Sequence, residues 1–158
     1  MLIFCKTKYG ADIIVKALEK ASITAASLHS GKTQAVREEA LQNFKDSNLR
    51  VLVATDVAAR GIDVDNITLV INYNLPEDPR NYIHRIGRTA RAGKSGMAIS
   101  FAVENDIRQL INIENSIGQV IPVVTEQPFH KAFSKVPKEV IKKVNKTNRT
   151  NNTRKKRK

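Results

Sequence analysis

The sequence contains one cysteine, no tryptophan and few other aromatic residues. A single thiol, Cys5, excludes an internal disulfide framework and any zinc site built from several cysteines, so a reducing cytoplasm is the expected location. The three histidines, His29, His84 and His130, lie far apart, and no pair has the spacing of metal ligands. We therefore predict no metal site.

Long apolar runs are also absent. No run approaches the roughly 18 consecutive apolar residues that a membrane-spanning helix needs. The N-terminal residues MLIFCK contain too few apolar side chains for the core of a signal peptide. We expect neither a membrane partner nor secretion.

The excess of positive charge is confined to one end of the chain. The formal net charge is +12, but residues 131–158 alone carry a net +11, and residues 1–130 carry a net +1. From Val144 onward the sequence is mostly Asn, Thr and basic residues with little to bury, which is typical of a disordered segment. We predict one domain over residues 1–126 and a basic, largely disordered tail over residues 127–158.

Apolar runs alternate with helical patterns before this tail. Strands are expected at 2–5, 23–28, 50–55, 67–73, 96–103 and 119–124, and helices at 9–21, 34–45 and 104–117. The run RVLVAT (50–55) is continuous and β-branched, as in a parallel strand that is buried on both faces. The alternation predicts an α/β domain with a mostly parallel sheet flanked by helices.

Polar residues follow several of the expected strands, at 6–8, 29–32, 55–56 and 72–74. In open parallel sheets, ligands bind beyond the ends at which the strands finish. Loops are generally polar because they are exposed, so position alone does not separate a binding site from ordinary surface.

The segment YIHRIGRTARAGKSG (82–96) ends in Gly-Lys-Ser, as a phosphate-binding P-loop does. Its glycines, Gly87 and Gly93, are separated by five residues, whereas the P-loop motif has four between them. A P-loop also follows a strand and opens a helix, whereas here a strand is expected after the glycines. We predict a turn into that strand at 93–96.

The same segment is rich in arginine. Asp78 and Pro79 predict a helix start, and Arg85, Arg88 and Arg91 at steps of three would share one side of that helix. One interpretation is a solvated basic face. The use of Arg at all three positions, with small residues between them, favours close approach to an anion such as phosphate.

Four segments occur in an order that resembles a known family. LIFCKTK (2–8), HSGKTQAVRE (29–38), VLVATDVAARGIDV (51–64) and YIHRIGRTARAG (82–93) together resemble the second, C-terminal RecA-like domain of DEAD-box ATP-dependent RNA helicases. The resemblance extends over residues 2–124 and implies a three-layer RecA-like fold. The chain departs from the family's commoner residues at Ser30 and at Ala90.

The resemblance implies an ATP site shared with another domain. Arg88 and Arg91 would reach the γ-phosphate, and Arg88 is the expected arginine finger. Asp63 would accept hydrogen bonds from the ribose hydroxyls, and Arg60 would help to assemble the interdomain contact.

Two further residues, His84 and Arg85, would connect to the other domain and couple RNA binding to hydrolysis. For Asp56, a structural role within the loop 55–60 and a ligand contact both remain open.

The resemblance also implies a surface that binds the RNA backbone without reading its sequence. The expected contacts are Thr7, Gly31, Gln34, Arg37 and Thr55.

The family's first RecA-like domain, with the Walker A lysine and the Asp-Glu-Ala-Asp segment that holds Mg²⁺, is not in this sequence. We therefore expect no ATP hydrolysis by this chain alone. A non-enzymatic RNA-binding protein and an inactive truncated fragment remain as alternatives.

Overall fold

The computed structural model describes residues 1–59, 64, 67–90, 93 and 95–130. The chain divides into two compact units, Met1–Ala102 and Val103–Lys158. The predicted domain boundary at 126 stays a prediction, and Arg60, Asp63, Arg91 and the predicted tail from 131 onward lie outside the described residues.

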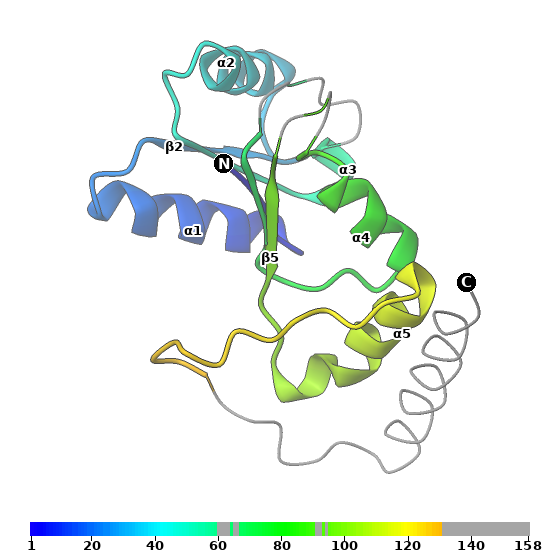
Figure 1. Ribbon diagram of the computed structural model, residues 1–158. Helices are drawn as coiled ribbons and strands as arrows, with labels where there is room; N and C mark the ends of the chain where they lie inside the picture. Colours follow the sequence, from blue (N-terminus) through cyan, green and yellow to red (C-terminus); the bar gives the residue numbers. More distant parts are fainter. Residues whose placement is uncertain (60–63, 65–66, 91–92, 94, 131–158) are drawn as a thin grey trace, which may run out of the picture. The chain divides into compact units, whose positions relative to one another are not determined.

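The first unit is built around a parallel sheet (Figure 1). Along the chain it contains β1 (Leu2–Phe4), α1 (Lys8–Lys20), β2 (Ala25–Leu28), α2 (Gln34–Lys45), β3 (Val51–Ala54), α3 (Asp56–Ala59), β4 (Leu69–Asn72), α4 (Pro79–Ile86) and β5 (Met97–Ser100). The strands pair in the order β2-β3-β1-β4-β5, and each described pair is parallel. The predicted α/β class with a parallel sheet flanked by helices is confirmed.

The strands end together at one edge of the sheet, which we call the carboxyl edge. Phe4 is in register with Ala54 and with Asn72, while Leu28 is in register with Ala54 and Asn72 with Ser100. Residues that directly follow the strands are therefore brought close together although they are far apart in the sequence.

Alternate strand residues point to opposite faces of the sheet, so each face has its own core. The core on the α1 face contains the buried residues Ile3, Cys5, Ala11, Ala25, Val51 and Val53. The core on the α2 and α3 face includes Leu2, Phe4, Leu28, Ala40, Phe44, Leu52, Ala54, Ala58 and Ala59. All four residues of β3 are buried, so the prediction of a strand covered on both faces is confirmed.

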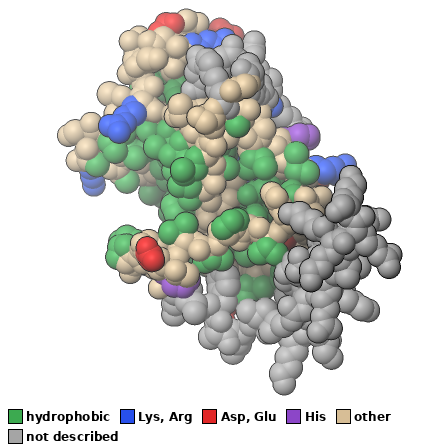
Figure 2. Space-filling model, in the orientation of Figure 1, with side chains coloured by type: hydrophobic (Ala, Val, Ile, Leu, Met, Phe, Trp, Pro, Cys, Tyr) green, Lys and Arg blue, Asp and Glu red, His purple; other side chains and the backbone are tan. Residues whose placement is uncertain are grey.

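The apolar surface extends beyond these cores on the α1 face. Ile99 is in register with Ile71, which packs against the α1 core, so both side chains point to that face. Next along the strands, the rings of Tyr73 and Phe101 meet edge to face with centroids 6.1 Å apart, and both side chains are exposed. Figure 2 shows hydrophobic side chains gathered over α1 and the neighbouring part of the sheet.

Side-chain caps begin the helices α1, α2 and α4. Thr7 Oγ1 accepts a hydrogen bond from the N–H of Gly10 at 3.0 Å, and Asp78 Oδ1 accepts from the N–H of Arg80 at 2.9 Å. Thr33 caps α2 in the same way. The predicted start of α4 at Asp78 and the predicted bounds of α2 are confirmed.

The helix α4 is shorter than the arginine spacing predicted. It ends at Ile86, with Gly87 as its C-cap, so the expectation that Arg85, Arg88 and Arg91 share one side of a helix is wrong. The hydroxyl of Thr89 donates to the carbonyl of Ile67, which draws the chain toward the sheet directly after the helix. Arg85 is inside the helix, whereas Arg88 follows it.

The second unit contains a short 3-10 helix, Glu104–Asp106, and α5, Ile107–Ile117. The helix predicted at 104–117 is therefore confirmed, with a tighter first turn. The strand predicted at 119–124 is wrong, since these described residues form no strand. The N–H of Ile121 donates instead to Glu114 Oε1 at 2.9 Å, and Pro122 has no N–H to give to a sheet.

Among the residues that the structure describes, no helix combines the length and the apolar character that crossing a membrane requires.

The turn between α4 and β5 gives a first prediction. Ala90 has a φ of +55°, and a Cβ on Gly96 would overlap Thr89 Oγ1 and lie 2.5 Å from the N of Ala90. We expect Gly96→Ala to lower the free energy of unfolding by about 1–3 kcal/mol through this overlap. Ala90→Gly should raise it by up to about 1 kcal/mol because glycine tolerates positive φ.

Urea unfolding of both variants measures these changes. Equal effects of the two substitutions would contradict the described geometry of this turn.

Candidate functional site at the carboxyl edge

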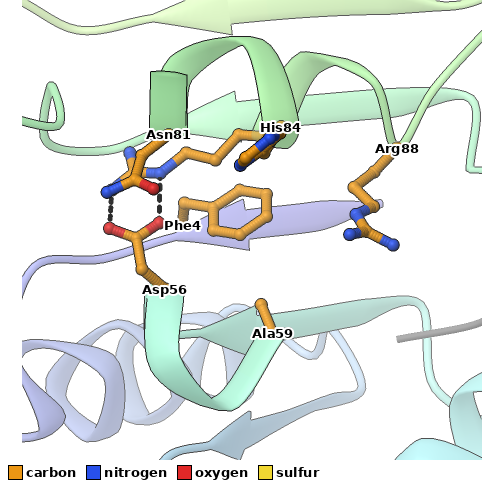
Figure 3. Close-up of a pocket in the computed structure, with 7 residues that line it drawn as sticks. Phe4, Asp56, Ala59, Asn81, His84 and Arg88 are labelled. Carbon is orange, nitrogen blue, oxygen red and sulfur yellow. Dashed lines mark hydrogen bonds and ion pairs between the residues drawn. The ribbon is translucent and has the colours of Figure 1, made fainter. Parts of the chain in front are cut away.

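The centre of the carboxyl edge is an ion pair between Arg85 of α4, which is buried, and Asp56 of α3, which is half-buried. Arg85 Nε donates to Asp56 Oδ1 at 2.6 Å, and Nη2 donates to Oδ2 at 2.7 Å, as the paired contacts in Figure 3 show. Arg85 Nη1 donates to Asn72 Oδ1 at 3.0 Å and to the carbonyl of Asn74 at 2.8 Å. The guanidinium also lies 5.0 Å from the centroid of the Phe4 ring. One side chain therefore joins β1, α3, α4 and the end of β4.

Two asparagines extend this network along the edge. Asn72 is fully buried, and its Nδ2 donates to Ser100 Oγ of β5 at 3.1 Å. Asn74 Oδ1 accepts from the backbone N–H of Lys6 at 3.1 Å and lies 3.6 Å from the Cys5 thiol sulfur. The ends of β1, β4 and β5 are thus tied to the same arginine.

A pocket opens beside this ion pair. Its lining consists of Phe4, Asp56, Ala59, Asn81, His84, Arg85 and Arg88. The buried residues Phe4 and Ala59 supply its apolar surface, whereas His84 and Arg88 supply polar side chains. Figure 3 shows His84 and Arg88 reaching the pocket from the α4 side, opposite Asp56. Cationic and hydrogen-bonding groups beside apolar walls suit an anion such as phosphate.

The predicted catalytic residues therefore have different surroundings. His84 is exposed and Arg88 is half-buried at the pocket, while only 2% of Arg85 is exposed. Four of the five guanidinium N–H groups of Arg85 donate within its own unit. The proposed connection of Arg85 to another domain stays a prediction. Asp56 has a structural contact, but its partner is on α4 and not within the loop 55–60.

The predicted RNA contacts also gather at the carboxyl edge. The N–H of Thr55 donates to the carbonyl of Leu28 at 3.2 Å, which places the end of β3 beside the loop after β2. In that loop, the N–H of Gly31 donates to His29 Nδ1 at 3.1 Å. Thr7 caps α1, which begins directly after β1.

Two of the predicted RNA-binding residues, Gln34 and Arg37, are hydrogen-bonded to each other on α2. Gln34 Oε1 accepts from Arg37 Nη1 at 3.1 Å, and Gln34 Nε2 donates to Glu38 Oε1 at 2.6 Å. Gln34 and Arg37 are therefore held on one side of the first turns of α2.

A cluster centred on Asp12 of α1 was not predicted from the sequence. Asp12 Oδ1 accepts from Ser27 Oγ at 2.6 Å and lies 3.1 Å from His29 Nε2 and 3.2 Å from Lys32 Nζ. We call Asp12, Ser27, His29 and Lys32 the Asp12 cluster. The one signal in the sequence is a carboxylate flanked by the apolar residues Ala11 and Ile13.

The cluster favours the charged form of Asp12. Hydrogen bonds from Ser27, and then from His29 and Lys32, hold the pKa of the Asp12 carboxyl well below its usual range, against the opposing effect of partial burial. This pKa is lower in the folded chain than in the unfolded chain. The cluster therefore stabilises the fold at pH values above the usual pKa of an aspartate. That contribution is lost as the pH falls toward the lowered pKa.

Comparison with known proteins agrees with this geometry. The family described as "Helicase conserved C-terminal domain" matches residues 1–93. The chain is 44% identical over 125 residues to ATP-dependent RNA helicase DBP8 of Meyerozyma guilliermondii, which covers 79% of this chain and 29% of that protein. It is 49% identical over 113 residues to eukaryotic initiation factor 4A of Dictyostelium discoideum, covering 72% of this chain and 28% of that protein.

Solved structures show the same likeness. The Escherichia coli DEAD-box protein SrmB, bound to regulator of ribonuclease activity A, is similar with a TM-score of 0.77 and 36% identity, over 85% of this chain and 81% of that chain. The C-terminal domain of the DEAD-box protein Dbp5 has a TM-score of 0.69 and 36% identity, over 74% of this chain and 69% of that chain.

The chain thus belongs to the helicase conserved C-terminal domain family. Within that family it is a C-terminal RecA-like domain of the DEAD-box RNA helicase type. It spans about three tenths of the length of the curated relatives described here, 29% and 28% respectively.

The ion pair at the carboxyl edge gives a second prediction. Asp56→Ala leaves a guanidinium that is 3% exposed without its carboxylate, so we expect the free energy of unfolding to fall by roughly 3 kcal/mol. Glu77→Ala is the matched control because its pair with Lys6 is equally short, at 2.7 Å, but exposed by 61% and 73%. That substitution should lower the free energy of unfolding far less, because solvent screens an exposed pair.

Urea unfolding of the two variants measures the difference. Similar losses in both would mean that burial does not strengthen the contribution of the Arg85–Asp56 pair.

Proposed function

We propose that this chain supplies one half of an ATP site and an RNA-binding surface in a DEAD-box helicase. An N-terminal RecA-like domain supplies the other half. The observation that carries the proposal is the pocket beside the Arg85–Asp56 pair, whose lining includes both His84 and Arg88.

The residues at this pocket fit a phosphate group. Arg88 provides a planar set of donors, and a guanidinium of this kind stabilises the charge that spreads over a transferring phosphoryl group. ATP supplies the bond that is hydrolysed. The Arg85–Asp56 pair fixes the start of the segment that carries Arg88, so that the donor is positioned by folding before ATP binds.

Further contacts in the ATP site are assigned to residues outside this pocket. Asp63 and Arg60 are proposed to contact the ribose and the domain interface, and Arg91 is proposed as a second γ-phosphate contact. The described residues contain no group of three or more His, Cys, Asp or Glu side chains arranged to hold a metal ion. We assign Mg²⁺ to the N-terminal domain because the resemblance to DEAD-box helicases implies it.

RNA binding is proposed for the other part of the carboxyl edge. Thr7, Gly31, Gln34, Arg37 and Thr55 present hydroxyl, amide, guanidinium and backbone groups there. Such groups bind phosphate and ribose without reading the bases. Closure of two domains on ATP would then couple this surface to hydrolysis and to local strand separation.

The third prediction tests the shared ATP site. RNA-stimulated ATP hydrolysis is measured for the chain alone and after addition of a separately produced N-terminal RecA-like domain. We expect turnover only with both parts, and Arg88→Ala should lower it by about a thousandfold because an arginine finger contributes that much. Arg80→Ala, which changes an exposed arginine in the first turn of α4, is the control and should change turnover less than about twofold.

Turnover by the isolated chain would contradict the proposal that the site is shared. An Arg88→Ala loss no greater than that of Arg80→Ala would remove Arg88 from the site.

One observation favours a second function, RNA binding without ATP. Residues 131–158 carry a net +11 charge, and clustered cations gain affinity for nucleic acids by releasing counterions. In this candidate function the basic tail is the main RNA anchor.

The fourth prediction separates the two candidates. Deletion of residues 145–158 removes seven basic residues and no acidic ones. If the tail is the anchor, the slope of log affinity against log salt should flatten by up to about 5. An unchanged slope and affinity would show that RNA binds elsewhere on the chain.

A further inference from the structure

The Asp12 cluster joins α1 to the loop after β2, which carries Gly31. His29 is the first residue after β2, and only 3% of its surface is exposed. Its two ring nitrogens have different partners, the Asp12 carboxylate at Nε2 and the Gly31 N–H at Nδ1, each at 3.1 Å. The imidazole therefore connects α1 to the loop.

These two contacts favour one of the two neutral tautomers of the ring. A backbone N–H only donates, so His29 Nδ1 must accept from Gly31. In a neutral imidazole the proton is then on Nε2, where it donates to Asp12. The other neutral tautomer would place an N–H against the Gly31 N–H and a lone pair against the carboxylate. The cationic ring would likewise lose the bond to Gly31.

The ring also sets the shape of the turn. A Cβ at position 31 would lie 3.1 Å from His29 Nδ1 and 3.2 Å from Cε1, so the glycine backbone packs directly on the imidazole. The N–H of Lys32 donates to the carbonyl of His29 at 3.1 Å and closes the turn. Thr33, the N-cap of α2, and Gln34, its first residue, follow at once.

We propose that Asp12 is a positioning residue for the RNA-binding surface. By accepting from His29 Nε2–H, it selects the tautomer whose Nδ1 holds the Gly31 turn and thereby orients the start of α2. Gly31, Gln34 and Arg37 are then in place before RNA arrives. This inference rests on the proposed function, because it assigns a purpose to residues that the proposal places at the RNA backbone.

The remaining two members of the cluster hold the carboxylate. Ser27 Oγ and Lys32 Nζ both reach Asp12 Oδ1, so the group stays ionised and in one position. Lys32 belongs to the same turn as Gly31, and its ammonium therefore gives the turn a second attachment to α1.

The first test compares two substitutions at position 12. Affinity for a single-stranded oligouridylate is measured by fluorescence anisotropy with the full chain, well below each variant's thermal midpoint. Asp12→Ala removes the acceptor and should weaken binding about threefold to tenfold, as expected for one lost hydrogen bond to a charged or polar group. Asp12→Asn keeps an acceptor oxygen and should recover most of that loss. Glu19→Gln, the same change of charge at the exposed far end of α1, is the matched control.

The second test separates the two nitrogens of His29. An asparagine side chain can present an oxygen near the position of Nδ1, whereas a glutamine can present an N–H near Nε2. His29→Asn should therefore keep RNA affinity better than His29→Gln, because only the former can accept from Gly31. In the unsubstituted chain, ¹⁵N shifts of the His29 ring should report the Nε2–H tautomer, and in Asp12→Ala they should report a mixture.

Arg37→Ala distinguishes failure of the positioning role from failure of the proposed RNA-binding surface. If Arg37→Ala weakens RNA binding but Asp12→Ala leaves both affinity and tautomer unchanged, the positioning role is wrong and the proposed function stands. If neither substitution changes affinity, the RNA surface itself is wrong, and the inference falls with it. Weaker binding in both, with recovery in Asp12→Asn, supports the inference.

Discussion

The ion pair between Arg85 and Asp56 is the contact on which the carboxyl edge depends. A guanidinium is costly to bury unless its charge and its donors are satisfied, and here carboxylate, amide and carbonyl oxygens surround it. Because these oxygens come from α3 and from the end of β4, both segments are brought to α4 when the charge is neutralised. The segment that carries His84 and Arg88 is positioned by the same contact, so stability and the candidate site have a common origin.

The carboxyl edge has two regions, each organised by a carboxylate from a helix. Asp56 of α3 fixes Arg85 beside the pocket, and Asp12 of α1 fixes His29 beneath the loop after β2. The buried side chains of Arg85 and His29 hold these two regions in shape, whereas Arg88 and Arg37 are half-buried.

Much of the fold could be predicted from the sequence, because alternation of apolar runs and helical stripes reflects local burial. The bounds of α2 and the start of α4 follow from such local signals. The end of α4 does not, since the bond from Thr89 to Ile67 joins residues 22 apart, and the absence of a strand at 119–124 depends on Glu114. The Asp12 cluster could not be predicted for the same reason, because Ser27 and His29, the partners of Asp12, are 15 and 17 residues away in the sequence.

The position of Cys5 has a practical consequence. It is the one cysteine of the sequence, it is 2% exposed, and its sulfur lies beside the same asparagine whose carbonyl accepts from Arg85. A thiol reagent can reach it only when the end of β1 separates from its neighbours. The rate of thiol labelling therefore measures how often this edge opens, and the measurement needs no engineered cysteine. The same rate, measured with and without nucleotide or RNA, would report ligand binding as protection of a single atom.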